Sequence, residues 1–261
     1  MTQHERPNVL WVYAHPTARS MNHALMVEGV RALSTDHDVV VSDLYAQRWN
    51  PVLSVDDLGD TALQGSTFGD ATKAAYQEGR LPEDVRREQA RLRAADVLVL
   101  QFPLWWTGMP AILKGWVDRV FSHGFAFGVK DPDTGHTRKY GDGGLAGRRA
   151  LAITTAGDRS SAFGPRGING DADSLMFPIT HGLFWYTGMA PLWPHVITAT
   201  DTPGWDSYEA ERAALVHRLR DVGTETPIPF RHMRGGDYDD DRMLRPDVAP
   251  GRTDLAMHQI S

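Results

Sequence analysis

Short apolar runs alternate with amphipathic stretches along most of the chain. Five runs rich in Val, Ile, Leu and aromatic residues have the length and continuity of strands that are buried on both faces. They are NVLWVYA (8–14), DVVVSDL (38–44), DVLVLQF (96–102), RRALAITTA (148–156) and an apolar segment around 190–199. Because strand and helix patterns alternate five times, the sequence predicts a parallel sheet with helices on both faces.

The stretches between these runs carry helix start signals and one apolar face. Ser20 can cap a helix that begins at Met21, and Pro82 and Pro110 stand where later helices would begin. The segment 45–80 is polar and punctuated by glycine, which predicts a long loop with short helices. Besides the helix after Ser20, the predicted helices are 81–95, 110–121, 171–186 and 206–222.

The alternating pattern ends near residue 222. We therefore expect one α/β domain over 1–222 and a C-terminal extension over 223–261. The extension has scattered prolines and no apolar stripe, so it either wraps the body or a partner subunit, or is partly disordered. Its acidic run DYDDD (237–241) lacks the spacing of a calcium loop and is expected to be solvated.

Composition narrows the classes of function. A formal charge of -6 disfavours nucleic acid or an anionic membrane surface as the main partner. The absence of cysteine excludes thiolate chemistry and is compatible with a reducing cytoplasm. With no apolar run near the roughly 20 residues that span a bilayer and no signal-peptide core, we expect a cytoplasmic protein without membrane insertion. The 11 histidines show no paired-ligand spacing, so no metal site is expected.

Three loops leave the predicted carboxyl ends of the strands, where ligands bind in sheets of this kind. They are 15–20, 103–109 and 156–170, and we predict that they form one site. The first, within HPTARSMN (15–22), offers hydroxyls, Arg19 and a helix N-terminus, which suit a phosphate. An ordinary capped helix with a solvated Arg19 explains the same residues equally well.

The second loop, PLWWTGMP (103–110), contains two adjacent tryptophans, and its Gly108 permits a tight turn. In an extended backbone Trp105 and Trp106 would point in opposite directions, so both cannot enter the core. At the mouth of a parallel sheet this favours a stacking wall for a planar ligand, whereas elsewhere one surface tryptophan would be ordinary.

The third loop, TTAGDRSSAFGPRGINGD (154–171), begins with hydroxyls and small residues. Small residues let the backbone approach a flat ligand, and the N–H groups of 155–157 would stabilise negative charge on it. Phe163 and Asn169 are the candidate side chains over the ring. A flexible surface loop is the alternative.

Taken together, these motifs resemble the NAD(P)H:quinone oxidoreductase family of flavodoxin-like flavoproteins, in register from about residue 8 to 222. The resemblance implies a flavodoxin-like, doubly wound, five-stranded sheet and a homodimer with one FAD per subunit, FMN being less expected. It also implies two-electron, ping-pong hydride transfer from NAD(P)H through FAD to a quinone. The segments that carry it are SDLYAQRWNPVLS (42–54), FPLWWTGMPAILKGWVDRVF (102–121), FAFG (125–128), ITTAG and GINGD.

The resemblance further implies which residues form the site. Phe163 and Asn169 stand where the mammalian enzymes carry a Tyr and a His. Phenylalanine cannot donate a proton, and asparagine does not titrate. The proton for the product would therefore come from water. Trp106, Gly157, Phe163 and Asn169 are the implied catalytic positions, and Phe127, Val129 and Tyr186 the implied substrate pocket, Tyr186 closing it from the other subunit. The implied cofactor-binding residues are His15, Arg19, Ser20, Met21, Asn22, Pro103, Leu104, Trp105, Trp106, Thr107, Thr154, Thr155, Ala156 and Gly157.

Two other functions stay open at this point. The altered third loop leaves room for another conjugated acceptor, such as an azo or nitro compound or a polyketide quinone. A regulatory or ancillary subunit with the same fold is the alternative outside enzymes, because relatives of this family act as ancillary subunits of ion-efflux systems.

Overall fold

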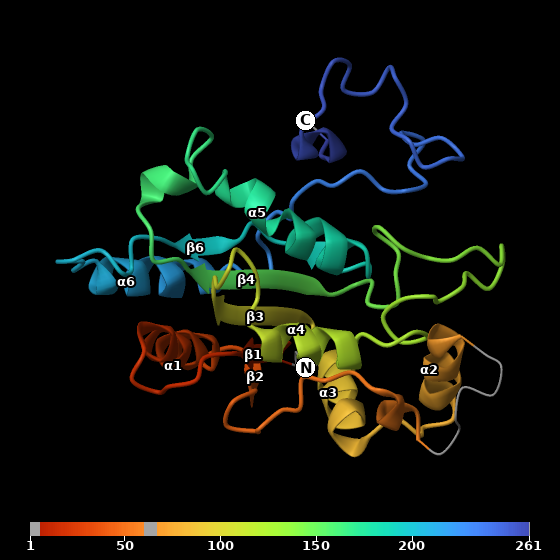
Figure 1. The fold of residues 1–261 in the computed structure, drawn as a ribbon, viewed down its shortest axis with the longest axis horizontal. Helices are drawn as coiled ribbons and strands as arrows, with labels where there is room; N and C mark the ends of the chain where they lie inside the picture. The colour runs from red at the N-terminus through yellow and green to blue at the C-terminus, as the bar shows by residue number, and fades with distance from the viewer. Residues whose placement is uncertain (1–5, 60–66, 261) are drawn as a thin grey trace, which may run out of the picture.

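A computed structural model of the chain describes residues 6–59 and 67–260 and contains one sheet whose strands are all parallel (Figure 1). The strand order is β2–β1–β3–β4, and two short strands share the next position beside β4. The predicted doubly wound α/β fold is therefore confirmed. The strands are β1 (Asn8–Tyr13), β2 (Asp38–Asp43), β3 (Val97–Pro103), β4 (Arg149–Thr155), β5 (Ala190–Pro191) and β6 (His195–Ile197).

The single strand expected around 190–199 is broken into β5 and β6. Ala190 N donates to Arg148 O at 2.7 Å and Leu192 N to Ala150 O at 2.8 Å, so the segment still follows β4. Pro191 and Pro194 have no N–H to give to the ladder, and this interrupts the strand between its two halves.

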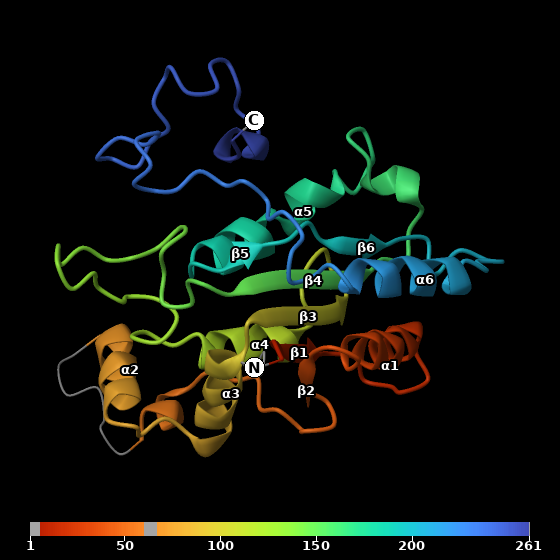
Figure 2. The same cartoon turned by 180° about the vertical axis from the view of Figure 1, so that it is seen from behind.

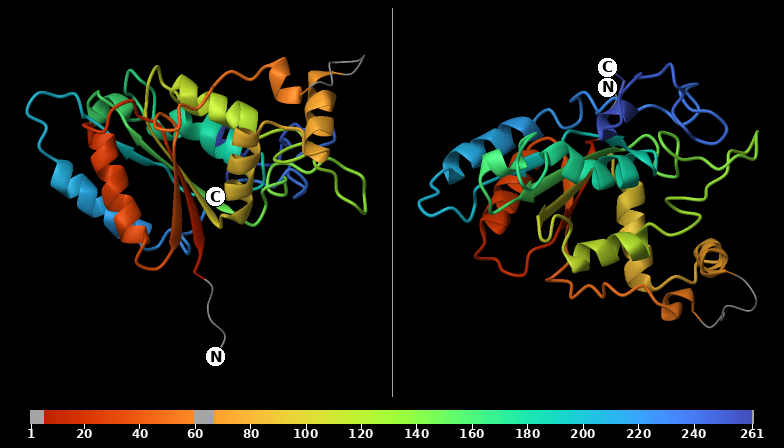
Figure 3. Two further views of the ribbon diagram at one scale, coloured as in Figure 1. Left: turned by 90° about the horizontal axis from the view of Figure 1, so that it is seen from below. Right: turned by 45° about the horizontal axis from the view of Figure 1, so that its top comes forward.

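Helices cover both faces of the sheet and give the protein two apolar cores. On one face α1 and α6 lie side by side and bury Leu25 and Leu215; on the other, α3, α4 and α5 bury Leu92, Trp116 and Met176 (Figure 3). In the described ranges no helix combines the length and the apolar character that crossing a bilayer requires. The α-helices are α1 (Met21–Leu33), α2 (Phe68–Gln77), α3 (Glu83–Ala94), α4 (Ala111–Val120), α5 (Ala172–Ile179) and α6 (Tyr208–Leu219), and the 3₁₀ turns are η1 (Val55–Leu58), η2 (Ser160–Phe163) and η4 (Leu255–His258).

The helix expected over 171–186 changes type in the middle. Its second half, η3 (Thr180–Trp185), is a π-helix, in which Tyr186 N donates to His181 O at 3.0 Å and Met189 N donates to Phe184 O at 3.0 Å. Pro178 lies near the change and has no N–H for an α-helical bond. A π-helical turn carries one more residue than an α-helical turn, so it changes which side chains face outwards and is often found at functional sites.

The C-terminal extension packs on the body, above α5 and η3 (Figures 1 and 2). Ile228 N donates to Pro191 O at 2.8 Å, and Ile260 N donates to Pro229 O at 2.7 Å, so the extension folds back on itself. Ile228 and Phe230 are buried and anchor it through apolar contact. In a single chain the described part of the extension therefore lies against the body.

A chain of buried polar side chains joins the start of α1 to the sheet. Gln101, in the middle of the sheet and fully buried, accepts a hydrogen bond from Trp11 Nε1 at 3.0 Å and donates one to Asn22 O at 2.7 Å. Asn22 Nδ2 in turn donates to Thr155 Oγ1 at 2.7 Å. Ser20 caps the same helix by accepting from His23 N at 3.1 Å, as predicted. The loops after β1 and β4 are thereby held in one fixed arrangement.

Replacing Gln101 by leucine should lower the free energy of unfolding by about 2–4 kcal/mol, because it leaves two buried groups, Trp11 Nε1 and Asn22 O, without partners. Urea denaturation of the variant measures this. In a double-mutant cycle with Trp11→Phe, a coupling of about 1 kcal/mol is expected, since the second change removes one orphaned donor. Strictly additive effects of the two changes would show that the Trp11–Gln101 bond contributes nothing.

His195 on β6 predicts a pH dependence of stability. Burial, followed by the charge of Arg218, lowers its pKa from 6.5 to about 4, and its Nε2 is buried without a hydrogen-bond partner. The unfolded chain therefore binds a proton before the folded chain does, so stability is lost as the pH falls from about 6.5 to 4. Between pH 7.5 and 5, His195→Leu should reduce this loss by about 1–2 kcal/mol, as measured by urea denaturation at the two pH values.

The matched control for that measurement is His136→Gln, because His136 is exposed in a loop. It should leave the pH dependence of unfolding as in the parent protein. An unchanged pH dependence in His195→Leu would mean that the imidazole of His195 is already solvated in the folded state.

Candidate functional site

A cavity of about 410 Å³ lies beyond the carboxyl ends of the strands. Residues from all three predicted loops line it, which brings the loops after β1, β3 and β4 together. The loop after β6 contributes a fourth part of the wall that the sequence did not indicate. The lining residues are His15, Ser20, Met21, Asn22, Pro103, Leu104, Trp105, Thr155, Gly157, Thr200, Asp201 and Trp205.

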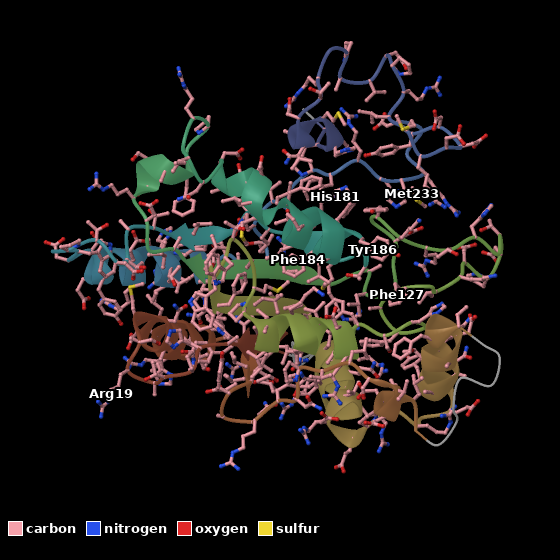
Figure 4. All side chains as sticks on the ribbon, in the orientation of Figure 1. Arg19, Phe127, His181, Phe184, Tyr186 and Met233 are labelled. Atoms are coloured by element: carbon pink, nitrogen blue, oxygen red, sulfur yellow. The ribbon has the colours of Figure 1, made fainter. Side chains whose placement is uncertain are left out.

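The first loop brings the N-terminus of α1 to the cavity. The first N–H groups of a helix have no partner within the helix. Their positive partial charge can therefore attract a negatively charged group of a ligand. Asn22 is 4% exposed and its Oδ1 has no hydrogen-bond partner, although its Nδ2 is bonded. A buried unpartnered acceptor in a cavity wall fits a ligand that carries an N–H or O–H group. Arg19 is exposed and points away from the body, outside the cavity wall (Figure 4).

The second loop is a two-residue turn rather than an extended segment. Trp105 N donates to Gly108 O at 3.1 Å and Gly108 N donates to Trp105 O at 3.0 Å. The two residues between them, Trp106 and Thr107, have φ values of 51° and 59°. Gly108 closes this tight turn, while the left-handed conformation, which is strained for side chains of this size, falls on Trp106 and Thr107.

This turn separates the two tryptophans. Trp105 is 43% exposed, lines the cavity and lies with its ring centroid 6.3 Å from that of His15. Trp106 is 100% exposed and, like Thr107, takes no part in the cavity wall of a single chain. So large an exposed ring on a strained turn indicates a surface that a ligand or another subunit covers.

The third loop reaches the cavity through Thr155 and Gly157, while Thr154 and Ala156 are buried behind the wall. Ala156 N donates to Ile197 O at 2.8 Å, so one of the three N–H groups expected to face the ligand is already used. A Cβ on Gly157 would collide with the carboxylate of Asp201. Any larger residue at position 157 would therefore displace the side chain of Asp201 where the two loops meet.

Thr200, Asp201 and Trp205 are the lining residues that sequence reasoning missed. They belong to the loop after β6, at the same edge of the sheet as the other three loops. The signal was present, because a loop must follow the fifth strand at this edge. The end of that strand was hidden by the break between β5 and β6.

Besides Trp106, two more of the four implied catalytic residues lie outside the cavity wall. Phe163 is partly buried in η2, and Asn169 Nδ2 donates to Asp158 Oδ2 at 3.0 Å. The pKa of Asp158 is lowered, first by the backbone N–H of Arg159 and then by Asn169. In a single chain Asn169 therefore bonds within the third loop itself, and neither side chain lines the ligand cavity.

The three residues implied for the substrate pocket also lie elsewhere in the chain. Phe127 and Tyr186 line a separate cavity of about 740 Å³ beside the C-terminal extension, and Val129 lines another of about 400 Å³. Phe127 and Tyr186 lie at the opposite end of the molecule from Arg19 (Figure 4). In one chain they are thus apart from the cavity at the carboxyl edge of the sheet.

No group of three or more His, Asp or Glu side chains suited to a metal ion is found within residues 6–59 and 67–260. The ionisable side chains in the wall of the 410 Å³ cavity are those of His15 and Asp201. The cavity therefore offers planar apolar surface, a helix N-terminus and hydroxyls, which bind and orient a ligand more than they exchange protons with it.

Comparisons with known proteins agree with this geometry. A family described as having a flavodoxin-like fold matches residues 7–222. The chain is 36% identical to human ribosyldihydronicotinamide dehydrogenase (quinone), over 85% of this chain and 94% of that one. It is 34% identical to NAD(P)H dehydrogenase (quinone) 1 from Rattus norvegicus, over 85% of this chain and 79% of that one.

Among solved structures, one of a candidate quinone reductase from Klebsiella pneumoniae superimposes with a TM-score of 0.92 and 41% identity. It covers 97% of this chain and 100% of its own, so the similarity extends into the C-terminal extension. The chain belongs to the flavodoxin-like family of NAD(P)H:quinone oxidoreductases.

Proposed function

We propose that this protein is a flavin-dependent NAD(P)H:quinone oxidoreductase that carries out two-electron hydride transfer through FAD by a ping-pong mechanism. The observation that carries the proposal is the convergence of four loops on one cavity at the carboxyl edge of the sheet. The names of the relatives support the reaction class. A cytoplasmic location stays a prediction.

The residues in the cavity wall fit a flavin nucleotide. Pro103, Leu104 and Trp105 give a flat apolar wall. The start of α1 suits a phosphate group. Asn22 Oδ1, which is unpartnered, can accept a hydrogen bond from a ribityl hydroxyl or a ring N–H. Bound FAD supplies the redox chemistry, since its ring system takes a hydride from NAD(P)H and gives it to the quinone. FAD is proposed over FMN from the family resemblance.

The protein contributes by binding and orienting the reactants. Gly157 lets a planar ligand approach the loop after β4 closely, and the rigid chain from Gln101 through Asn22 to Thr155 fixes the wall around it. Neither Phe163 nor Asn169 can supply the proton that the quinone takes up with the hydride. Solvent supplies that proton in our proposal.

We further propose a homodimer in which the site is completed across the interface. Trp106 is fully exposed, and the implied pocket residues Phe127 and Tyr186 lie at the far end of the same chain from the first cofactor loop. In a symmetric dimer, the aromatic residues of one subunit cover the cofactor loops of the other. The same pocket then serves NAD(P)H and quinone in turn.

A second candidate is the reduction of another conjugated acceptor, such as an azo or nitro compound or a polyketide quinone. It is favoured by the position of Phe163 and Asn169, whose side chains lie outside the cavity wall and impose no hydrogen-bonding pattern on the acceptor. A larger or differently substituted acceptor is then tolerated.

The first experiment identifies the cofactor. Heat-denatured protein should release one FAD per chain, which chromatography separates from FMN. Under anaerobic conditions NADH or NADPH should bleach the flavin absorbance, and a quinone should restore it, because the hydride passes in two separate steps. A flavin that is bound but not bleached would favour the ancillary-subunit alternative, and protein that binds neither nucleotide would exclude the proposed reaction.

The second experiment tests the turn after β3. Trp106→Ala should weaken flavin retention and lower turnover by about 3- to 10-fold each, because it removes one aromatic stacking surface. Trp193→Ala is the control, since Trp193 is another exposed tryptophan but belongs neither to the turn after β3 nor to the cavity wall. If Trp106→Ala binds flavin and turns over like the control, the ring of Trp106 does not cover the cofactor.

A further inference from the structure

A second cavity, of about 370 Å³, lies between η3, the loop that precedes β4 and the C-terminal extension. It shares no residue with the cavity at the carboxyl edge of the sheet, but it shares Lys139, Met233, Tyr238 and Arg242 with the 740 Å³ cavity that Phe127 and Tyr186 line. Figure 4 shows His181 of η3 and Met233 of the extension at this end of the molecule. Its wall is unusual in charge, in ring content and in backbone conformation.

Three cations and no carboxylate line this cavity. Arg231 is neutralised by Asp237, with Arg231 Nη1 2.8 Å from Asp237 Oδ2. Lys139 and Arg242 form no ion pair with a carboxylate of the described ranges, and no protein atom there accepts a hydrogen bond from either side chain. Burial, and then the charge of Arg242, lower the pKa of Lys139. The two cations thus repel one another across a common space, and a bound anion would relieve that repulsion.

The carboxylate of Asp142 accepts from Lys139 N at 2.7 Å, and Asp239 and Asp240 line the larger neighbouring cavity, which Lys139 and Arg242 also line. Asp239 is engaged in the turn that carries Arg242, because its Oδ1 accepts from Met243 N at 2.8 Å. The wall of the smaller cavity itself contains no carboxylate, and the Arg242 that it includes is exposed to solvent.

Flat rings form the rest of the wall. His181 stacks on Phe177, with ring centroids 4.5 Å apart and planes at 16°, and lies 5.0 Å from the ring of Tyr140. Burial lowers the pKa of His181 to about 4, so this ring is neutral at neutral pH. Tyr238 stacks on His258 at 6.0 Å and its hydroxyl lies 2.9 Å from His258 Nδ1. Such surfaces suit the face of a planar ligand.

Two residues of the wall hold strained backbone conformations. Tyr140 has φ 51° and Arg242 has φ 68°, in the left-handed region that favours glycine. Tyr140 is fixed by bonds on both sides, since its N donates to Tyr186 O at 3.1 Å and its O accepts from Met233 N at 3.3 Å. Strain of this kind persists where the surroundings impose it, and it concentrates at binding sites.

We propose that this cavity binds a small planar aromatic anion, one or two fused rings that carry a carboxylate or an equivalent acid group. The acid group lies between Lys139 and Arg242, and the ring lies against Tyr140 and the stacked pair of His181 and Phe177. The volume is at the lower end of the range for small-molecule sites, which limits the ligand to about two rings. The site shares no residue with the cavity proposed for the flavin, so it does not require bound flavin.

The experiment compares 2-naphthoate with its neutral isostere 2-naphthamide by isothermal titration calorimetry on the full chain. One molecule of 2-naphthoate should bind per chain, at least about 10-fold more tightly than the amide, because a charge-assisted contact favours the anion. Equal affinity of the two compounds, or no binding of either, would overturn the proposal.

Two variants locate the binding. Lys139→Met should weaken 2-naphthoate about 5- to 10-fold and leave the amide unchanged. Arg242→Gly should weaken 2-naphthoate similarly while raising the unfolding midpoint, because glycine tolerates the left-handed conformation that arginine holds there. Loss of affinity together with gain of stability separates a ligand contact from damage to the fold.

Arg245→Gln is the matched control, since Arg245 is an exposed arginine of the same extension outside the cavity wall and pairs with Asp247. It should bind 2-naphthoate as the parent protein does. Flavin-loaded and flavin-free protein should also bind it equally. Binding that flavin abolishes, or that Lys139→Met and Arg242→Gly leave intact, would assign the ligand to the cavity at the sheet edge and refute the second site.

Discussion

The side-chain amide of Gln101 is the contact on which the site geometry depends. It lies fully buried in the central strand β3, and there both ends of an amide must find partners. It finds them in Trp11 of the neighbouring strand and in the first turn of α1, whose Asn22 extends the connection to Thr155 of β4. Three of the four loops around the candidate cofactor cavity are thus positioned by one buried polar chain. In contrast to apolar packing, which tolerates small shifts, this chain has a defined geometry, so it holds the cavity wall in place without help from a ligand.

Local signals were enough to predict the order of strands and helices. Continuous apolar runs and the cap at Ser20 report on short stretches of chain, and the structure has the strands and the helix where they indicated. The errors arise where distant segments decide the outcome. The π-helical half of the helix after Asp171 lies beneath the C-terminal extension, more than 40 residues later in the chain, with Phe230 against the ring of His181. The sequence of the helix itself contains no signal for such packing.

The candidate site was predictable to the same degree. The rule that parallel sheets bind ligands at the carboxyl edge brought three of its loops together, and nine of the residues implied for the cofactor line the cavity: His15, Ser20, Met21, Asn22, Pro103, Leu104, Trp105, Thr155 and Gly157. The direction of a side chain in a turn was not predictable, because it depends on which residues take positive φ. Trp106 and Thr107 do so, and Trp106 is turned outwards where an extended backbone would have placed it differently. The loop after β6 was missed because the prolines that break the fifth strand also hid where it ends.

Those prolines have a second effect. The fifth position is an outer edge of the sheet, and an outer edge presents unpaired N–H and C=O groups to any other extended chain. Pro191 and Pro194 have no N–H, so that edge lacks two hydrogen-bond donors. The backbone N–H of Ile228 in the extension donates to the carbonyl of Pro191, which is then no longer free. A neighbouring molecule therefore finds no continuous ladder to join. The irregularity that makes this strand hard to recognise also guards the folded protein against edge-to-edge aggregation.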